Sequence, residues 1–270
     1  MKQVKTLHRV KPHTQVKLSH FPADDTGSYT SEKEANSDLE AHREKLDSLQ
    51  NLLYASAQHS VLVVLQGMDT GGKDGTIRHI FSGVNPQGCS VTSFKLPTPL
   101  EMRHDFLWRA HAAVPPKGII GIFNRSHYED VLVVRVHDQI SGKEAHRRMD
   151  EIVSFEEMLA ANDVVILKFF LNISQDEQTR RLAARLDDPK KHWKISESDF
   201  AERKLWPDYQ RAYEDVLSRT SRKHAPWFIV PSNQKWYRNV AISKILVETL
   251  AALKMKYPQP AVDVASLTLD

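Results

Sequence analysis

A short glycine-rich stretch, Gly67 to Lys73, has the residue types and spacing of a loop that holds phosphate groups. It reads Gly-Met-Asp-Thr-Gly-Gly-Lys and satisfies the pattern G-x-x-x-x-G-K. The glycines of this pattern let backbone N–H groups curl around phosphate oxygens, and the lysine neutralises their charge. An apolar run precedes the stretch and a helical segment follows it, which favours this interpretation over a plain strand-to-helix turn. We expect phosphate contacts from Gly67, Gly71, Gly72, Lys73, Asp74, Gly75 and Thr76.

Two carboxylates accompany this loop. Asp74 stands where a serine or threonine normally contacts Mg²⁺, and Asp69 lies inside the loop. Their negative charges would repel phosphate unless at least one of them faces a divalent cation or a basic residue. We expect Asp69 to face Mg²⁺, for which Mn²⁺ could substitute. Asp74 either caps the following helix or has a functional role, and the sequence leaves both interpretations open.

A second polar group follows the apolar run at residues 118–124. In a doubly wound parallel sheet the carboxyl ends of the strands form the ligand crevice, so this group should emerge beside the glycine loop. Arg125 offers paired donors for a phosphoryl group, and Glu129 and Asp130 can order Mg²⁺. The alternative is an ordinary polar turn. We expect catalytic roles for Asp69, Lys73, Arg125 and Glu129, nucleotide contacts from Asp69, Asn124, Arg125, Glu129 and Asp130, and metal contacts from Asp69, Glu129 and Asp130.

A strongly basic run follows the apolar run at residues 164–173. Its cations are Arg180, Arg181, Arg185, Lys190, Lys191 and Lys194, with His192, and the acidic residues in it are Asp187 and Asp188. A solvated helix face is the ordinary explanation for such a run. Its position after the fourth run, where P-loop kinases carry a mobile lid, favours a polyanion-binding lid at about residues 176–206. We expect contacts to the polyanion from Arg180, Arg181, Arg185, Lys191 and Lys194.

The elements that must position these residues are predicted by five short apolar runs, at 61–67, 90–95, 118–124, 164–173 and 227–231. Several of them lack polar alternation, which is typical of strands covered on both faces. Helical segments lie at about 72–82, 99–113, 143–161, 174–187, 199–219 and 236–254. The chain therefore predicts a three-layer α/β/α fold with a five-stranded parallel sheet. We expect an N-terminal arm and helix at residues 1–58, packed on a phosphate-transfer domain at 59–270.

Composition narrows the classes of protein further. The chain has 270 residues, of which 41% are hydrophobic and 26% charged, and its formal net charge is +3. This modest charge argues against a general nucleic-acid-binding surface. No apolar run approaches the roughly 18 residues of a membrane span, so we expect a cytoplasmic protein without a membrane partner. One cysteine, Cys89, excludes a disulfide framework and a cysteine-rich zinc site.

Four sequence blocks together resemble the polyphosphate kinase 2 family. They are GMDTGGKDGT, FNRSHYEDVLVVRVH, ARLDDPKKHWK and WFIVPSNQKWYRN. The resemblance implies a thymidylate-kinase-like P-loop core, Mg²⁺ dependence, a helical lid and homo-oligomers, commonly dimers or tetramers. It matches Asp69 and Lys73 to the family's loop aspartate and lysine, and Arg125 to the arginine after the third strand.

This chain departs from many family members at two places. They have Asp where Asn124 stands, and Asn-Arg where Glu129 and Asp130 stand. The pattern Asn-Arg-Ser-x-Tyr-Glu is similar to the class III branch, which is associated with phosphorylation of both nucleoside mono- and diphosphates.

These observations lead to a hypothesis of function. We expect Mg²⁺-dependent, reversible transfer of phosphoryl groups from inorganic polyphosphate to nucleoside mono- and diphosphates, from AMP to ADP and from ADP to ATP. An ATP-dependent nucleotide kinase of the P-loop class is the nearest alternative, although it would not require so basic a lid. A P-loop nucleic-acid-binding regulatory module is an alternative from another class. The low net charge and the absence of clustered aromatic residues beside the basic run argue against it.

Overall fold

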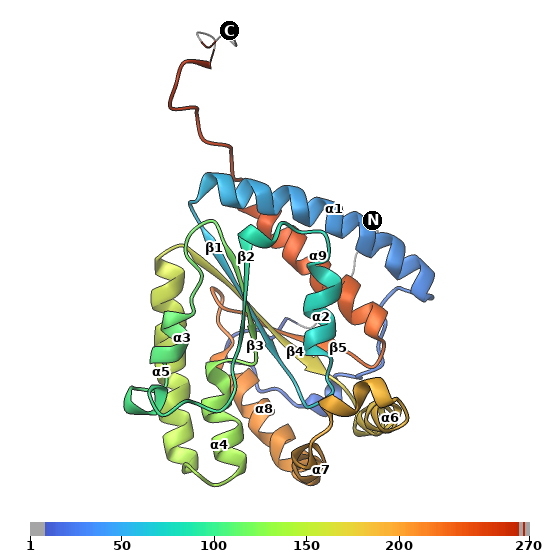
Figure 1. Cartoon of the computed structure of the whole chain (residues 1–270). Helices are drawn as coiled ribbons and strands as arrows, with labels where there is room; N and C mark the ends of the chain where they lie inside the picture. Colours follow the sequence, from blue (N-terminus) through green and yellow to red (C-terminus); the bar gives the residue numbers. More distant parts are fainter. Residues whose placement is uncertain (1–8, 265–266, 268–270) are drawn as a thin grey trace.

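Five parallel strands form a sheet in the order β2-β3-β1-β4-β5 in the computed structural model, which describes residues 9–264 and residue 267. The strands are β1 Ser60–Gln66, β2 Cys89–Ser93, β3 Ile120–Asn124, β4 Val164–Asn172 and β5 Trp227–Pro231. Figure 1 shows them with helices on either side. All five predicted strands are confirmed, with ends that shift by at most two residues from the predicted bounds.

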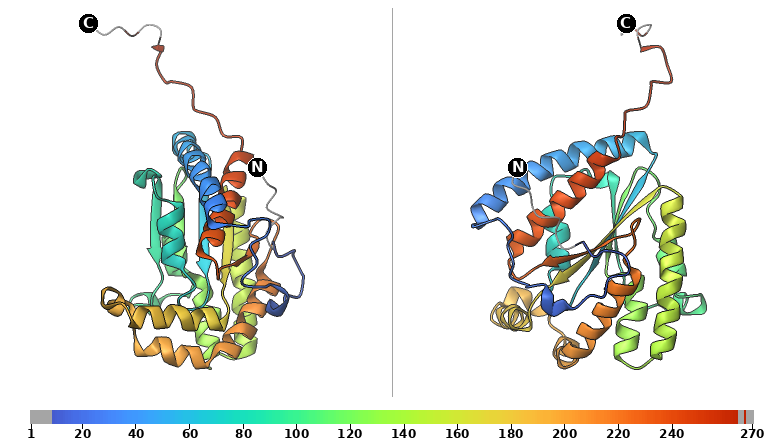
Figure 2. Two further views of the ribbon diagram at one scale, coloured as in Figure 1. Left: turned by 90° about the vertical axis from the view of Figure 1, so that its right-hand side faces the viewer. Right: turned by 180° about the vertical axis from the view of Figure 1, so that it is seen from behind.

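The central strand β1 supplies both hydrophobic cores. Its residues are buried throughout, and alternate side chains point to opposite faces of the sheet. Leu62 and Val64 belong to the core beneath α5 (Gly142–Ala161) and α8 (Trp206–Thr220). Val61, Val63 and Leu65 belong to the core beneath α1 (Glu32–Ser56), α2 (Lys73–Ile80) and α9 (Lys235–Ala252). This arrangement, seen from two further sides in Figure 2, confirms the three-layer α/β/α fold.

The N-terminal segment binds along the sheet edge before it forms a long helix. The Val10 amide donates a hydrogen bond to the carbonyl of Trp227 in β5 at 2.9 Å. The helix α1 (Glu32–Ser56) begins at Ser31, whose side chain accepts a hydrogen bond from the Glu34 amide. Leucines at helical spacing bury one side of α1, which packs beside α9 (Figure 1). Residues 1–8 of the predicted arm, and residues 265–266 and 268–270 of the predicted second domain, lie outside the described residues.

Two predicted helices are each divided in the structure. In the segment 99–113, the Asp105 side chain accepts a hydrogen bond from the Leu107 amide, a local turn that competes with a continuous helix. In the segment 199–219 the break lies at Leu205, where Pro207 opens the next helix without a backbone donor. The remaining elements are α2 Lys73–Ile80, α3 Trp108–Ala112, α4 Val133–Val136, α6 Gln175–Leu186, α7 Glu197–Lys204, α9 Lys235–Ala252, and the short 3₁₀ helices η1 Leu18–His20, η2 Pro86–Gly88, η3 Glu101–Arg103, η4 His127–Val131 and η5 Pro189–Lys194.

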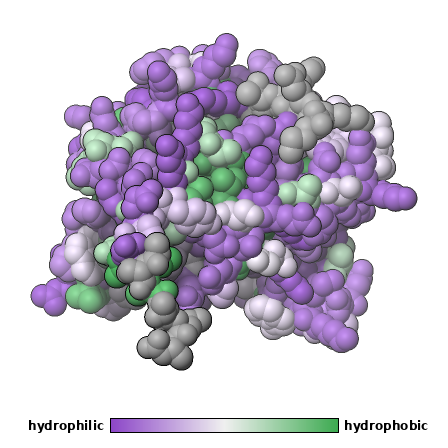
Figure 3. All heavy atoms as spheres, turned by 90° about the horizontal axis from the view of Figure 1, so that it is seen from above, coloured by the Kyte–Doolittle hydropathy of each residue, from purple (hydrophilic) through white to green (hydrophobic). Residues whose placement is uncertain are grey.

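The face formed above α1 and α9 is mostly hydrophilic, with a smaller apolar area near its centre (Figure 3). In the part of the chain that the structure describes, no helix is both long enough and apolar enough to cross a bilayer.

The register of the sheet determines where the polar loops meet. Leu65 of β1 lies beside Asn124 of β3, and the Arg125 amide donates a hydrogen bond to the Leu65 carbonyl at 3.1 Å. The loops that follow β1 and β3 therefore leave the sheet side by side at its carboxyl edge.

Candidate active site

The glycine loop connects β1 to α2 through a tight turn. Thr70 and Gly72 both have positive φ angles, 63° and 98°. A Cβ atom on Gly72 would lie 2.0 Å from Nη1 of Arg238, so glycine is required there by space as well as by backbone angle. Lys73 begins α2 and is buried, and its Nζ donates a hydrogen bond to the Gly67 carbonyl at 2.7 Å. The lysine is thus folded back against the loop that it was predicted to assist.

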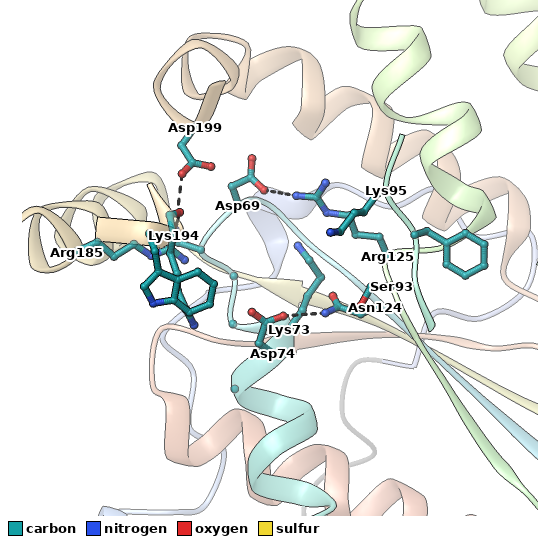
Figure 4. A pocket seen from close by; sticks show the side chains of 16 residues that line it. Asp69, Lys73, Asp74, Ser93, Lys95, Asn124, Arg125, Arg185, Lys194 and Asp199 are labelled. Atoms are coloured by element: carbon teal, nitrogen blue, oxygen red, sulfur yellow. Dashed lines mark hydrogen bonds and ion pairs between the residues drawn. The ribbon is translucent and has the colours of Figure 1, made fainter. Parts of the chain in front are cut away.

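Asp69 and Arg125 connect the two polar loops. Nη2 of Arg125 donates a hydrogen bond to Oδ1 of Asp69 at 2.8 Å, and Figure 4 shows the two side chains pointing toward each other. Arg125 has a φ of 60°, in the left-handed region that non-glycine residues seldom adopt. Such a backbone persists where the surrounding structure holds it, often at functional sites. The backbone at Arg125 is therefore locally strained, and this conformation places the guanidinium beside Asp69.

Asp74 forms a second connection between these loops. Its Oδ1 accepts a hydrogen bond from Nδ2 of Asn124 at 2.7 Å. Asp74 lies in the first turn of α2, where its negative charge interacts favourably with the helix dipole. The N-cap position itself is occupied by Gly72. An aspartate in place of Asn124 would set two carboxylates against each other. Asn124, which stands where many family members have aspartate, therefore suits its partner Asp74, which stands where a serine or threonine is usual.

A cavity of about 490 Å³ opens over the glycine loop. Figure 4 shows its side chains converging from β2, β3, α2 and the segment that follows α6. Lys95, Arg185 and Lys194 bring positive charge to its wall, whereas Asp69, Asp74 and Asp199 bring carboxylates. We call it the loop cavity; it is lined by residues 69–75, 93–95, Asn124, Arg125, Arg185, Trp193, Lys194 and Asp199.

A second cavity of about 550 Å³ adjoins the loop cavity at the Asp69–Arg125 pair. Its wall includes Glu129, Tyr209 and Tyr213, together with the apolar side chains of Leu96 and Val133. We call it the tyrosine cavity. Four residues line both cavities: Asp69, Lys95, Arg125 and Asp199. The ion pair between Asp69 and Arg125 therefore lies where two molecules bound in the two cavities would meet.

The charged groups around Lys73 shift one another's pKa values. Burial lowers the pKa of Lys73, and Arg125 lowers it further, against the opposing effect of Asp69, Glu129 and Asp74. Burial also raises the pKa of Glu129, although Arg125 and Lys73 counteract this shift. Burial opposes the charge on Arg125, but Glu129 and Asp69 outweigh it and raise the pKa of that guanidinium. The site thus holds cations and carboxylates in a partly desolvated cluster, in which electrostatic interactions are strong.

Asp130 does not join this cluster. Its Oδ2 accepts a hydrogen bond from Nη2 of buried Arg109 at 2.9 Å, and it lines neither cavity. The predicted metal and nucleotide contacts of Asp130 therefore have no support in the structure. Asp69 and Glu129, the other two predicted metal ligands, do border the tyrosine cavity. Among the described residues, no group of three or more histidine, cysteine or acidic side chains could hold a metal by itself.

The basic residues of the predicted lid fall into three sets, of which the buried Arg181 is one. Arg185 and Lys194 line the loop cavity, and Nη1 of Arg185 lies 3.8 Å from Oδ2 of Asp199. Arg180 and Lys191 are exposed, line neither cavity and form surface ion pairs with Glu177 and Asp188.

Arg181 is buried beneath the loop and was predicted to contact a polyanion together with Arg185. Its Nη1 donates to the Thr70 carbonyl at 2.8 Å, and its Nη2 donates to the carbonyls of Ser232 and Asn233. The side chains of Arg181 and Arg185 therefore have different surroundings, although they are one helical turn apart.

Sequence reasoning missed Lys95 and Asp199. Lys95 lies two residues after the edge strand β2, and it is the last residue of the run at 90–95, which indicates only a strand in the sequence. Asp199 follows Ser196 at the spacing of a capping box, and its Oδ2 does accept a hydrogen bond from the Ser196 amide. This capping contact is sufficient to explain Asp199 in the sequence, although the residue also borders both cavities. Burial and the charge of Asp69 raise the pKa of Asp199.

Comparisons with known proteins agree with the resemblance in the sequence. The family model for polyphosphate kinase 2 matches residues 29–258. An AMP/ADP-polyphosphate phosphotransferase of Meiothermus ruber is 52% identical over 254 residues, which cover 94% of this chain and 95% of that protein. An ADP-polyphosphate phosphotransferase of Rhodopseudomonas palustris is 45% identical over 263 residues, with 93% and 91% covered. The crystal structure of a polyphosphate kinase 2 from Arthrobacter aurescens matches with a TM-score of 0.91 at 40% identity, and 96% of each chain is covered.

Proposed function

Because this chain belongs to the polyphosphate kinase 2 family, we propose that it transfers phosphoryl groups reversibly from inorganic polyphosphate to nucleoside mono- and diphosphates. It would convert AMP to ADP and ADP to ATP. The observation that carries this proposal is the pair of cavities that share Asp69 and Arg125. Transfer between two bound phosphate compounds requires two adjoining sites whose reacting ends meet, and this geometry provides them.

The loop cavity is assigned to polyphosphate. Its wall contains Lys95, Arg185, Lys194 and the first turn of α2, and Lys73 lies at the start of that helix. Every unit of a polyphosphate chain carries negative charge, so the chain requires cations and oriented amides along its path.

The tyrosine cavity is assigned to the nucleotide acceptor. Tyr209, Tyr213 and the apolar residues beside them offer surfaces on which a planar base can pack. Arg125 and Glu129 lie at the end nearest the loop cavity, where the accepting phosphate would be placed.

The proposed reaction needs no covalent intermediate on the protein. Phosphoryl transfer depends mainly on alignment and on stabilisation of charge that spreads over the transferred group. Arg125 would donate hydrogen bonds to that group after exchanging its partner Asp69 for substrate. Lys73 would turn from the Gly67 carbonyl to a phosphate oxygen. The segment from Arg185 to Asp199, part of the predicted lid, would exclude water from both cavities.

The residues present fit Mg²⁺ that arrives with the substrates. Mg²⁺ usually keeps several waters and binds one or two carboxylates together with substrate phosphates. Asp69, Glu129 and Asp199 could supply such carboxylates, and Mn²⁺ could replace Mg²⁺. The ion would neutralise phosphate charge and hold the two substrates near each other.

The direct test uses purified protein, polyphosphate and Mg²⁺, with AMP, ADP, GMP or GDP added in turn and no ATP. Separation of the products should reveal nucleoside di- and triphosphates. An ATP-dependent kinase would instead form product only when ATP replaces polyphosphate, and that result would overturn the proposal. Retention of DNA or RNA without any nucleotide turnover would favour a nucleic-acid-binding module.

Arg185→Ala should raise the KM for polyphosphate about tenfold while changing the KM for nucleotide much less. Arg185 faces only the loop cavity, and loss of one charge-assisted contact to phosphate costs about 1.5 to 3 kcal/mol. Initial rates measured against each substrate would separate the two constants. Added salt should produce a similar defect in the unchanged protein by screening the same contact. Arg147→Ala removes an exposed helical arginine from the distant helix α5 and serves as the matched control. An equal rise in the KM values for polyphosphate and nucleotide would indicate a general defect in closure of the lid.

Glu129→Asn should reduce AMP phosphorylation more than ADP phosphorylation, and should shift the ratio of their kcat/KM values about tenfold, or about 1.4 kcal/mol. A monophosphate reaches less far toward the donor, so it should depend more on metal that a carboxylate positions. An amide is a weaker ligand for Mg²⁺. Because the pKa of Glu129 is raised, AMP activity should also decline on acidification at a higher pH than for an ordinary glutamate. An unchanged AMP-to-ADP ratio at saturating polyphosphate would remove Glu129 from acceptor selection.

We also propose that the protein acts in the cytoplasm as a homo-oligomer, either a dimer or a tetramer. The resemblance to the family supports the oligomer, and the modest net charge of +3 supports small anionic substrates over nucleic acid as partners.

A further inference from the structure

The carbonyl groups of the glycine loop all accept hydrogen bonds from the protein. Within the loop and α2, Lys73 donates to the carbonyls of Gly67 and Met68, and the Gly71 amide also donates to Met68. The amide and hydroxyl of Thr76 both donate to Gly72.

The three carbonyls in the middle of the loop are bound by side chains from distant elements. Nε2 of Gln178 donates to the Asp69 carbonyl at 3.1 Å, and Arg181 donates to the Thr70 carbonyl at 2.8 Å. Both side chains come from α6. Arg238 of α9 makes a longer contact of 3.5 Å to the Gly71 carbonyl.

Unlike the Gly71 amide, three amides of the same loop are left free to bind a ligand. Among residues 9–264, the backbone N–H groups of Thr70, Gly72 and Lys73 donate no hydrogen bond of acceptable distance and angle to another group of the protein. A peptide plane that turns its carbonyl toward one side presents the N–H group of the next residue to the other side. Carbonyls bound from beneath the loop therefore favour amides that point into the loop cavity.

We propose that Gln178 and Arg238 are positioning residues, which bind the carbonyls of Asp69 and Gly71 from beneath and so orient the amides of Thr70 and Gly72 toward phosphate. This proposal deepens the proposed function, on which it rests for the identity of the substrate. These residues lie outside the glycine-loop sequence pattern, and they reach the loop from 109 to 167 positions further along the chain.

Both side chains are themselves held in place. Gln178 is 1% exposed, and its Oε1 accepts a hydrogen bond from Nη1 of Arg203 in α7 at 2.9 Å. Arg238 is 2% exposed, and it donates to Oδ1 of Asn239 at 2.8 Å. A buried side chain with a fixed partner can hold a backbone group within the small tolerance that phosphate binding requires.

Arg238 also brings charge that no nearby carboxylate neutralises. In the described part of the chain it forms no ion pair, and burial together with Arg181 lowers its pKa. Burying an unpaired cation is costly unless an opposite charge compensates it. Phosphate bound in the loop cavity would provide that opposite charge, with only the backbone of the glycine loop between it and Arg238.

The test compares variants that keep or lose the donor. Gln178→Leu and Arg238→Leu remove it, whereas Arg238→Gln keeps an amide donor without the charge. Gln175→Leu, on an exposed position of the same helix α6, is the matched control for Gln178→Leu. Isothermal titration with inorganic triphosphate, in the absence of nucleotide, measures phosphate binding without turnover. Amide NMR signals of Gly71 and Gly72 report the orientation of the loop.

Gln178→Leu and Arg238→Leu should each weaken triphosphate binding about tenfold, equivalent to 1.4 kcal/mol. They should also reduce the shift of the Gly72 amide signal on binding and raise the KM for polyphosphate. Arg238→Gln should recover part of the affinity, and Gln175→Leu should match the unchanged protein. A purely structural role would lower the active fraction and kcat without changing KM or triphosphate affinity, and that result would overturn the proposal.

Two features keep the outcome decisive. If Arg238→Leu fails to fold, as judged by thermal unfolding, Gln178→Leu alone carries the test because it removes no charge. Failure of the unchanged protein to use polyphosphate would overturn the proposed function, whereas triphosphate binding and the loop signals would still test the positioning residues.

Discussion

Lys73→Ala should lower kcat by at least about a hundredfold, the scale of losing one contact that stabilises the transition state. Lys73 begins α2 inside the loop, and four charged groups around it shift its pKa. Its Nζ donates to backbone carbonyls, so it can exchange one of these partners for a phosphate oxygen without moving far. Rates with polyphosphate and ADP, both at saturation, measure the loss directly.

The matched control for this change is Lys117→Ala. Lys117 is exposed and pairs with Asp163 at the opposite end of the strands, near the start of β3. Circular dichroism and thermal unfolding should show that Lys73→Ala keeps the native fold, because the hydrophobic cores do not include this side chain. Near-normal turnover in a folded Lys73→Ala protein would remove the lysine from the mechanism.

Asp69→Asn should also lower turnover by at least about a hundredfold. The amide has almost the same shape and its oxygen can still accept the hydrogen bond from Arg125, so the change tests charge more than structure. A neutral side chain would bind Mg²⁺ weakly and would remove the negative charge that Arg125 pairs with at this position. The loss should be partly reversed at high Mg²⁺ concentration if weaker metal binding is the cause.

Asp163→Asn is the corresponding control, since it neutralises an exposed aspartate that is paired with Lys117. If Asp69→Asn proved as active as this control, with an unchanged dependence on Mg²⁺, Asp69 would have no role in metal binding or transfer.

The sheet and the loop are predictable because their signals are local. Uninterrupted apolar runs predict the strands, since both faces of β1 are buried. The spacing from Gly67 to Lys73 predicts the phosphate loop because all its members lie within one turn of chain. Arg125 can be placed beside it because the carboxyl ends of parallel strands share one edge, as the contact to Leu65 shows.

The remaining features depend on contacts between distant segments. Charge and position after the fourth strand predicted that Arg181 contacts a polyanion, but its guanidinium reaches carbonyls on the loop and after β5. Asp130 adjoins Glu129 in the sequence, yet the turn of η4 directs it to Arg109. Asp199 has a sufficient local explanation as part of a capping box. In each case the residue type is informative, whereas its direction is set by tertiary packing.

The segment from Arg185 to Asp199 contributes to the walls of both cavities, and this has a consequence for how a polymeric substrate would be consumed. Arg185 and Lys194 border the loop cavity, and Asp199 borders both cavities. A movement that opens the tyrosine cavity to release a nucleotide would therefore also weaken the contacts that bind the polymer. An enzyme built in this way would shorten its donor distributively, with a chance of losing the chain after each transfer. To consume one polyphosphate chain to its end without releasing it, the enzyme would need a polymer-binding site outside the wall that the two cavities share.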